Sequence, residues 1–405
     1  MSAGTDLGGL RRINELAILA AVRAGADTLT EVVRETGLAR ASVGEVTRDL
    51  VASGWLSEAA PVVRGRGRPA VRYEYRAGAG VLIGADIGAF NLRVAISDLT
   101  GRRLTQSNRF TTPEVPARQR LKILDAAIND CLRDTGRERS DIWGVVAGST
   151  GRVGGGRVLL SAAIPDWTGV DLAGHLRRSL PDALVAVDND SRLAALAEQQ
   201  LGGTGASLAR QASRGTPSAK AAGRPESLVL LQAGRRTGLG LVVNGRPHAG
   251  FGGVAGDLSR FPALKWEGAM EYLQQSGVAP ASGATSDPVA DTLNAAIEGS
   301  PAALAAVRRY IRMLANTAGA VVSILDPEVL VLGGSLAAYG DLLLPLLASE
   351  LELLCLRMPR LEASTLGADC AVLGALCAAA ELVDDALIGS GPGPLPTHTR
   401  PLVST

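Results

Sequence analysis

The fold is decided by residues 81–101, which read VLIGADIGAFNLRVAISDLTG from Val81 to Gly101. Two short apolar runs around a tight turn predict two β-strands joined as a hairpin. Asp86 and Gly88 lie where a loop that binds nucleotide phosphates needs them. The turn then continues as Ala89, Phe90 and Asn91, which offer neither a hydroxyl nor a Lys to a phosphate. The segment therefore predicts a kinase scaffold that lacks part of its phosphate-binding chemistry.

The composition bounds the class of protein. The chain has 405 residues, which is enough for two or three domains. Hydrophobic residues make up 46% but aromatic residues only 3%, so the cores must consist of Ala, Leu and Val. A net charge of +1 gives no global signature of nucleic-acid binding, so any such footprint must be local. No segment has the pattern of a signal peptide or a membrane span, and we expect a cytoplasmic protein.

The cysteines argue against a metal cage or a disulfide framework. They are widely spaced, lie in apolar contexts and form no CxxC pair: Cys131, Cys355, Cys370 and Cys377. This pattern predicts buried, reduced thiols.

The N-terminal segment has the pattern of a winged helix-turn-helix. An amphipathic helix over residues 13–22 is followed by a short helix over residues 28–36, where Thr28 and Glu31 resemble a capping box. A third helix runs from about residue 40 to residue 53. Residues 55–57 and 71–75 then predict two strands of a wing.

Two groups of residues in this segment are candidates for DNA contact. The polar side of the third helix carries side chains that can reach base edges or phosphates. The chain between the wing strands alternates Arg and Gly up to Pro69, and such a slender arm suits a narrow minor groove. The candidates are Arg40, Ser42, Glu45, Thr47 and Arg48 on the helix, and Arg64, Arg66 and Arg68 in the arm. The alternative interpretation of the arm is a solvated linker between domains.

The charge balance of this segment bears on the oligomeric state. The first 80 residues carry eleven Arg against nine acidic residues. Charge-driven affinity of one copy is therefore modest, and we expect a homodimer or tetramer on a two-part duplex site.

From Gly78 onward, strands alternate with helices, which is typical of an α/β protein. We expect strands near residues 81–86, 92–98, 142–147, 157–161, 184–187, 227–232 and 239–243, and helices near 115–136, 190–201, 301–325 and 368–383. Residues 202–226 are rich in Gly, Ser and Ala and predict a disordered insertion, and residues 389–405 predict a disordered tail. We thus expect a DNA-binding domain over residues 1–77 and a sensor domain over residues 78–388.

The order of the motifs resembles the ROK family of repressors, open reading frames and sugar kinases, in its repressor form. The supporting segments are residues 67–70, 85–88, 187–190, 194–198, 238–246, 252–258 and 325–334. The resemblance implies an actin-like ATPase fold, related to ribonuclease H, of two α/β lobes. It also implies remnants of phosphate-binding loops at Asp86, Gly88, Gly234, Gly333 and Gly334.

Departures from the family pattern weaken the kinase interpretation. Family kinases continue the first loop with Gly-Thr-Lys and have Gly-Thr-Gly in the second, where this chain has Gly234-Arg-Arg. The family's zinc site requires one His and three Cys, but residues 259–271 contain neither, with Arg260 and Ala269 at two of the ligand positions. We therefore expect no structural metal, no cofactor and no kinase activity.

The resemblance also implies a ligand site at Asn189, Asp190, Asp257 and Glu271. Asp190 matches the family's general base, and we interpret it as a vestige that contacts a ligand. The family's sugar-binding Asn and His are replaced by Ala163 and Arg260. Buried together, the three carboxylates need hydroxyls, water or a nearby Arg such as Arg260 as partners.

Three functions are consistent with this pattern. The sequence favours a transcriptional regulator, acting as a repressor, whose kinase-like domain senses a sugar or a sugar derivative and forms the dimer. The second is an ATP-dependent sugar kinase with an accessory DNA-binding domain. The third is a DNA-binding protein that responds to no ligand.

Overall fold

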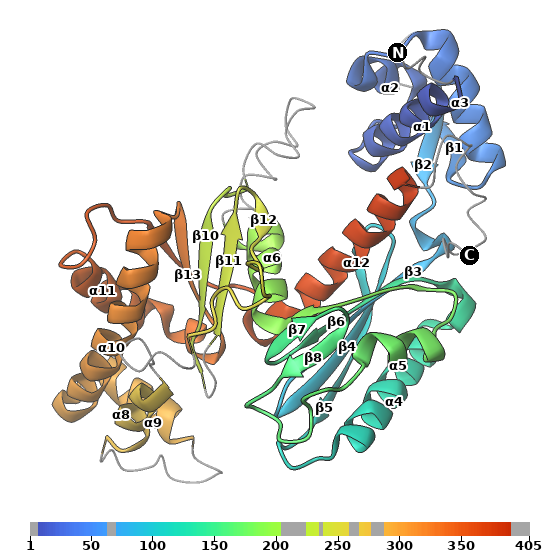
Figure 1. The fold of residues 1–405 in the computed structure, drawn as a ribbon. Coiled ribbons are helices and arrows are strands. Elements are labelled where there is room, and N and C mark those ends of the chain that lie inside the picture. The colour runs from blue at the N-terminus through green and yellow to red at the C-terminus, as the bar shows by residue number, and fades with distance from the viewer. Residues whose placement is uncertain are drawn as a thin grey trace. The chain divides into compact units, whose positions relative to one another are not determined.

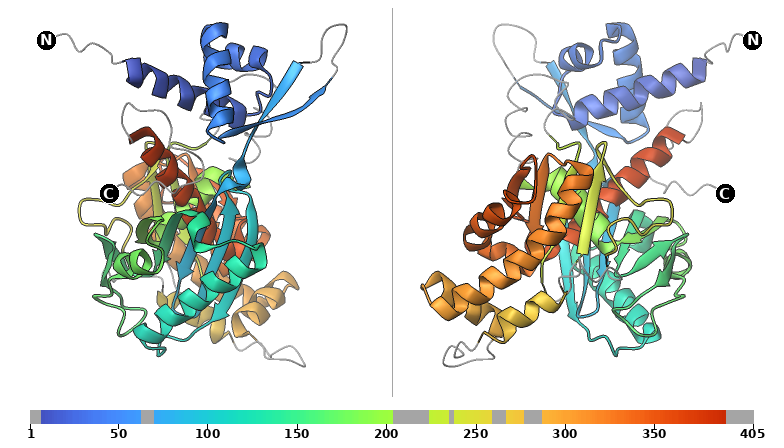
Figure 2. Two further views of the ribbon diagram at one scale, coloured as in Figure 1. Left: turned by 90° about the vertical axis from the view of Figure 1, so that its right-hand side faces the viewer. Right: turned by 60° about the vertical axis from the view of Figure 1, so that its left-hand side comes forward.

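The computed structural model describes residues 7–62, 70–203, 224–234, 238–258, 267–276 and 287–389. The chain divides into two compact units (Figures 1 and 2). Unit 1 comprises residues 1–147, 155–187 and 375–405, and unit 2 comprises residues 148–154 and 188–374.

The N-terminal part of unit 1 is a winged helix-turn-helix, as predicted. Its helices are α1 (Leu7–Arg23), α2 (Leu29–Thr36) and α3 (Arg40–Ala52), and its wing strands are β1 (Leu56–Val62) and β2 (Ala70–Tyr75). The two strands are antiparallel, with Leu56 opposite Tyr75. A small core holds the helices together, because Ile18, Val32 and Val43 are fully buried.

The start of α2 confirms half of the expected capping box. Thr28 Oγ1 accepts a hydrogen bond from the backbone N–H of Glu31 at 3.3 Å. The Glu31 carboxylate, however, accepts from the N–H of Asp27 at 3.1 Å. The cap thus reaches one residue further back than the motif predicts.

The remainder of unit 1 is a five-stranded sheet with helices on both faces. Its strands, in the order β5-β4-β3-β6-β9, are β5 (Arg103–Phe110), β4 (Asn91–Asp98), β3 (Val81–Ile87), β6 (Ile142–Ser149) and β9 (Leu184–Asn189). Val81 and Ile83 face the core shared with α4 (Ala117–Thr135) and α5 (Leu172–Ser179). Leu82 faces the opposite side, where Gly144 lies against Val383 of α12 (Cys370–Gly389).

Unit 2 contains a mixed sheet between two helical layers (Figure 1). The strand order is β12 (Arg246–Pro247), β11 (Gly238–Val243), β10 (Leu228–Gln232), β13 (Val329–Gly333) and β14 (Arg360–Ala363). Val229 and Leu231 face the core built by α8 (Met270–Gln274), α9 (Pro288–Ile297), α10 (Pro301–Leu325) and α11 (Gly340–Leu351). Leu228 and Leu230 face α6 (Asp190–Leu201) and the first turn of α12.

The remaining described elements are short. They are the strands β7 (Arg152–Gly154) and β8 (Arg157–Leu160), and the 3-10 turns η1 (Ala77–Ala79), η2 (Arg139–Asp141), η4 (Glu267–Ala269), η5 (Ser335–Tyr339) and η6 (Gly367–Asp369). The expected α/β alternation and the two-lobed fold class are confirmed. None of the helices in the described parts of the chain combines the length and hydropathy that crossing a bilayer requires.

The cysteines agree only partly with the expectation of buried thiols. Cys131 and Cys370 are buried, whereas Cys355 and Cys377 are half-buried. All four lie within the described residues, and no disulfide joins any two of them.

Candidate functional site

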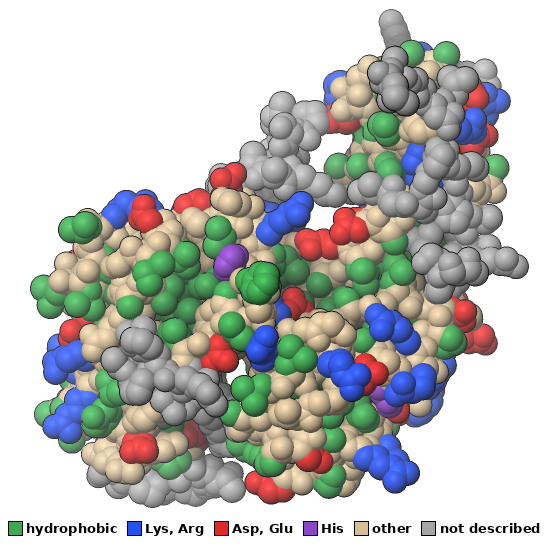
Figure 3. All heavy atoms as spheres, viewed as in Figure 1, with side chains coloured by type: hydrophobic (Ala, Val, Ile, Leu, Met, Phe, Trp, Pro, Cys, Tyr) green, Lys and Arg blue, Asp and Glu red, His purple; other side chains and the backbone are tan. Residues whose placement is uncertain are grey.

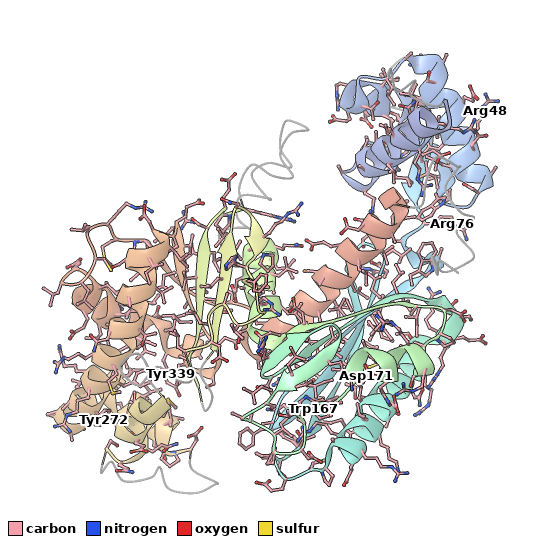
Figure 4. All side chains as sticks on the ribbon, in the orientation of Figure 1. Arg48, Arg76, Trp167, Asp171, Tyr272 and Tyr339 are labelled. Carbon is pink, nitrogen blue, oxygen red and sulfur yellow. The ribbon has the colours of Figure 1, made fainter. Side chains whose placement is uncertain are left out.

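The exposed face of α3 is the first candidate site. α2 ends at Gly37, whose φ of +68° lies in the left-handed region that glycine adopts without strain, and α3 begins at Arg40. Arg40, Glu45 and Arg48 are exposed along α3. Figure 4 labels Arg48 on this helix. The side chain of Ala41 is also exposed and small, so a nucleic-acid backbone or base edge can approach the helix closely.

Thr47 does not lie on this face, contrary to the prediction. It is only 1% exposed and is buried with Val43 and Leu50. The reason is its spacing, because positions three and four residues apart share one side of a helix. Thr47 is therefore not accessible to a DNA duplex in this structure. Ser42, another predicted contact, is half-buried.

The exposed face of α3 is tied to the neighbouring helices. Arg11 of α1 forms an ion pair with Glu45 at 3.7 Å and a second one with Asp49. Arg40 donates a hydrogen bond from Nη1 to Thr30 Oγ1 of α2 at 3.2 Å. Sequence reasoning missed Arg11, because its role depends on how α1 crosses α3.

Acidic and basic side chains are mixed on the described surface drawn in Figure 3. The predicted arm residues Arg64, Arg66 and Arg68 lie outside the described residues, as do Arg235, Arg236 and Arg260. The wing strands that flank the arm are described, and Val62 pairs with Ala70 at their open end. The arm therefore stays a prediction of the sequence.

In unit 1, groups of the turn after β3 form an ion pair and hydrogen bonds within the protein. The Asp86 carboxylate pairs with Arg93, which lies directly opposite on β4, at 3.2 Å. The N–H of Gly88 donates to the carbonyl of Asn91 at 2.9 Å. Phe90 contributes a carbonyl that accepts from the N–H of Thr111 at 2.9 Å. These bonds close the turn and balance the charge of its carboxylate.

Arg120 of α4 supports this turn from beneath and was not anticipated. Its side chain is fully buried, and Nη1 donates to the carbonyl of Gly88 at 2.7 Å and to Thr111 Oγ1 at 3.0 Å. The guanidinium also lies 5.9 Å from the centroid of the Trp167 ring, a residue labelled in Figure 4. A signal was present in the sequence, because Arg120 shares the spacing of the buried Leu124.

In unit 2, the start of α6 forms the second candidate site. Asn189 caps this helix, because its Oδ1 accepts from the N–H groups of Ser191 and Arg192 at 3.0 and 3.1 Å. Its Nδ2 donates to the carbonyl of Gly151 at 2.9 Å. Asp190 follows as the first residue of α6 and is half-buried. The side chain of Asn189 thus has a structural role here besides the predicted contact with a ligand.

Two arginines hold a glycine turn beside this helix start. Arg192 is 5% exposed, pairs with Asp188 and donates to the carbonyl of Gly253 at 3.2 Å. Arg152 donates to the carbonyl of Gly252 at 2.9 Å. These contacts join the start of α6 to the loop that leads to Asp257. Sequence reasoning missed both arginines, which become neighbours only through the fold.

The predicted carboxylates are not buried together. Asp257 is exposed at the end of this loop, and Glu271 is exposed in the first turn of α8. The desolvation cost expected for a buried trio therefore does not arise from these two side chains. They remain predicted ligand contacts.

The glycines expected to be phosphate-loop remnants have packing roles. A Cβ on Gly333 would lie 2.7 Å from Leu230 Cδ1, and one on Gly334 would lie 2.3 Å from the carbonyl of Ala233. Gly334 also has a φ of +77°. Gly234 follows directly after Ala233. Close contact between the ends of β10 and β13 thus accounts for Gly333 and Gly334 without a nucleotide.

Together these elements define a helix-turn-helix protein that carries a two-lobed, actin-like α/β fold. A model of the ROK family matches residues 82–263 and 271–381, and the chain belongs to this family. A model of the IclR helix-turn-helix domain matches residues 15–59. A search of curated proteins found no match.

Solved structures share the fold at low sequence identity. A ROK-family transcriptional regulator, a homologue of the E. coli Mlc protein, is 20% identical with a TM-score of 0.70 over 94% of this chain and 98% of its own. A ROK glucokinase from Streptomyces griseus with glucose and AMPPNP is 21% identical with a TM-score of 0.60, over 75% and 100%. A ROK protein from Streptococcus pneumoniae with sucrose is 21% identical with a TM-score of 0.56, over 75% and 98%.

Proposed function

We propose that this protein is a DNA-binding transcriptional repressor. Residues 1–77 bind an operator, residues 78–388 form the sensor and dimerisation module, and residues 389–405 are a tail. The observation that carries the proposal is the exposed face of α3, which carries Arg40, Arg48 and the small side chain of Ala41. A helix that follows a tight turn after a preceding helix can enter the major groove of DNA, as the recognition helix of a helix-turn-helix does. The arm at residues 64–68 adds contacts in the minor groove.

The turn after β3 supports a function other than phosphoryl transfer. A carboxylate at Asp86 that holds a nucleotide-bound cation has to be available to it, whereas here Arg93 pairs with it. The neighbouring carbonyl of Gly88 is occupied by Arg120. Residues 89–91 supply no hydroxyl or Lys, so the first loop does not fit the phosphates of a nucleoside triphosphate.

The family's zinc ligands are not supplied by the equivalent stretch of this sequence, because residues 259–271 contain no His or Cys. Ala269, at a ligand position of the family pattern, is fully buried in the core of unit 2 and has no donor atom.

The sensor function rests on the loops around the start of α6. Asp190 and Asp257 follow segments that Arg152 and Arg192 hold together. Carboxylates on anchored loops accept hydrogen bonds from the hydroxyls of a polyol. Glucose and sucrose occur in two of the similar solved structures. We therefore assign a sugar or a sugar derivative as the effector of this protein.

The test of DNA binding compares two Arg→Ala variants of equal charge change. Operators are first selected from a random-sequence duplex library with the full-length protein. Arg48→Ala should weaken binding to the selected duplex by about 5- to 150-fold, because a good base contact is worth roughly 1–3 kcal/mol. Arg178→Ala removes a charge from the exposed side of α5 and should leave affinity unchanged. Equal affinities of the Arg48→Ala variant and the native protein at matched salt would contradict the assignment of α3.

The alternative function, a sugar kinase with an accessory DNA-binding domain, is tested separately. ATP turnover is measured with a panel of sugars, for the native protein and for Asp190→Asn. We expect no sugar-dependent turnover. Turnover that Asp190→Asn abolishes would replace the sensor assignment with a catalytic one.

A repressor that responds to no ligand is distinguished by a thermal-shift screen with sugars and phosphosugars. A ligand that binds the folded state raises the unfolding temperature by mass action. We expect such a shift, smaller in Asp257→Ala. The absence of any shift across the screen would favour the ligand-independent alternative.

A further inference from the structure

The C-terminal helix α12 is the one described helix that takes part in both compact units. Its first residues, Cys370 to Gly374, belong to unit 2, and the rest of the helix from Ala375 onward belongs to unit 1. The helix is continuous over twenty residues. A continuous helix transmits displacement along its axis, because its backbone hydrogen bonds resist stretching and bending.

The first turn of α12 packs against the backbone of α6. Cys370 Sγ lies 3.2 Å from the carbonyl of Ala194, and a Cβ on Gly374 would lie 1.7 Å from the carbonyl of Leu193. Only glycine permits two helices to approach so closely. The other end of α6 starts with Asn189 as its cap and Asp190 as its first residue, which are predicted ligand contacts. A shift of α6 would therefore displace the first turn of α12 directly.

The last turns of α12 are held by α1 of the helix-turn-helix domain. Arg12 is 4% exposed, and both Nε and Nη2 donate to the carbonyl of Leu387, the Nε bond at 3.1 Å. Arg23 pairs with Asp384 at 2.7 Å and donates to the carbonyl of Leu99 at 2.9 Å. Carbonyl groups at the end of a helix carry partial negative charge, which these two cations complement.

The charges at this contact are partly withdrawn from water. Burial lowers the pKa of the Arg12 guanidinium, because the charged form loses hydration. The charged group therefore depends on its partners within the protein. For Arg23, burial acts to lower the pKa, but the charges of Tyr75 and Asp384 outweigh it and raise the pKa. Removal of Asp384 would leave the Arg23 guanidinium, whose side chain is 20% exposed, with fewer compensating partners. The contact is more than a solvated surface pair.

A second contact seats the helix-turn-helix domain on the same unit. The rings of Trp55 and Trp143 are both buried and meet edge to face, with centroids 5.4 Å apart. Trp55 precedes β1 of the wing, and Trp143 lies on β6. The Trp55–Trp143 contact joins the domain to the sheet of unit 1, whereas Arg12 and Arg23 of α1 join it to α12.

We infer that α12 couples the ligand loops at the start of α6 to the DNA-binding domain, with Arg12 and Asp384 as positioning residues. The inference rests on the proposed function. A ligand that binds two arrangements of α6 differently would bias the arrangement of α1, and thereby the affinity of α3 for DNA. Linkage requires the reverse as well, so DNA binding must change the stability of α6. This reverse effect can be measured without knowledge of the effector.

The test measures amide hydrogen exchange in residues 190–201 of the full chain, with and without a duplex selected from a random-sequence library. In the native protein, DNA should change the exchange rate by about fivefold or more, the lower end of typical coupling between sites. The double variant Arg12→Met, Asp384→Asn should still bind DNA but show no change in these residues. Asp385→Asn alters the exposed neighbour of Asp384 and should behave like the native protein.

Each outcome decides between the two proposals. DNA binding with unchanged exchange in residues 190–201 of the native protein would overturn the coupling but leave the proposed function intact. The same holds if the double variant retains the full change. Failure to select any duplex would overturn the proposed function and the coupling with it. Single Asp384→Asn, which keeps the shape of the side chain, replaces the double variant if the latter does not fold.

Discussion

Substitution of Gly374 by Ala should destabilise unit 2, although Ala favours helices. In an unobstructed helix, Gly→Ala stabilises by about 1 kcal/mol. Here the added Cβ would lie 1.7 Å from the Leu193 carbonyl oxygen and 2.4 Å from its carbon, and both partners are backbone atoms. Ordinary contact begins at 3.4 Å, so α12 and α6 must separate by about 1.7 Å.

The separation outweighs the gain in helix propensity. Overpacking of a tight contact costs about 1–3 kcal/mol, and a clash with backbone belongs at the upper end. The net loss in free energy of unfolding is therefore about 2 kcal/mol. For a unit of this size, the unfolding temperature should fall by about 4–8 °C. The assay is calorimetry or thermal denaturation of the full chain, with attention to the transition of unit 2.

A matched control lies in the same unit. Gly319 is inside α10, and its Cβ would lie 3.1 Å from both Cβ and Cδ1 of Leu354, a contact that a shift of a few tenths of an ångström relieves. Gly319→Ala should change the free energy of unfolding by less than about 1 kcal/mol. If Gly374→Ala matches the native protein or is more stable, the backbone contact between α12 and α6 is not as close as described.

Three further predictions concern buried polar groups. Arg120→Met removes the bonds to Gly88 and Thr111, and should lower the free energy of unfolding by about 3 kcal/mol or more in urea titrations; equal stability would refute a supporting role for this guanidinium. Burial raises the pKa of Glu198 and outweighs the hydrogen bonds from Ser364 and Cys370, which lower it. The charged carboxylate therefore destabilises the fold at pH values above the ordinary pKa of a Glu side chain. Glu198→Gln should therefore raise the unfolding temperature at pH 8, with a gain that shrinks on acidification to pH 4; a gain independent of pH would contradict the cause. Burial raises the pKa of Tyr75 to about 12, so the unfolded chain ionises first and stability falls between pH 10 and 12. Tyr75→Phe should reduce this fall, and identical alkaline profiles would exclude the effect.

Most of the fold follows from local pattern. The hairpin of residues 81–101 appears as β3 and β4, because a short apolar run bounded by turn residues suits a strand that is buried on both faces. Helices α2 and α3 begin and end near the predicted residues, since Gly37 and Gly54 stop a helix by backbone conformation alone, whereas α1 begins at Leu7, earlier than the apolar pattern over residues 13–22 predicts. These signals act over a few residues and need no tertiary information.

The candidate sites were predictable only in part. The prediction of Thr47 on the exposed face is wrong, because helical spacing places this polar side chain in the core with Val43. The pairing of Asp86 with Arg93 was implicit in the hairpin register but depends on the length of the turn. The ligand contacts at Asp190, Asp257 and Glu271 remain predictions, which a ligand-binding measurement would test.

The sequence by itself determined the class of this protein. The order of its motifs placed it in the ROK family with an N-terminal helix-turn-helix, and the residues at 89–91 argued against phosphate binding. The tertiary structure decided which charged groups have partners. Arg120 beneath the first turn, Arg192 at the glycine loop, and Arg12 at the end of α12 lie far along the chain from the carbonyls they bind. The hydrogen-bond partners of a buried cation are set by packing between distant elements, which no local pattern records.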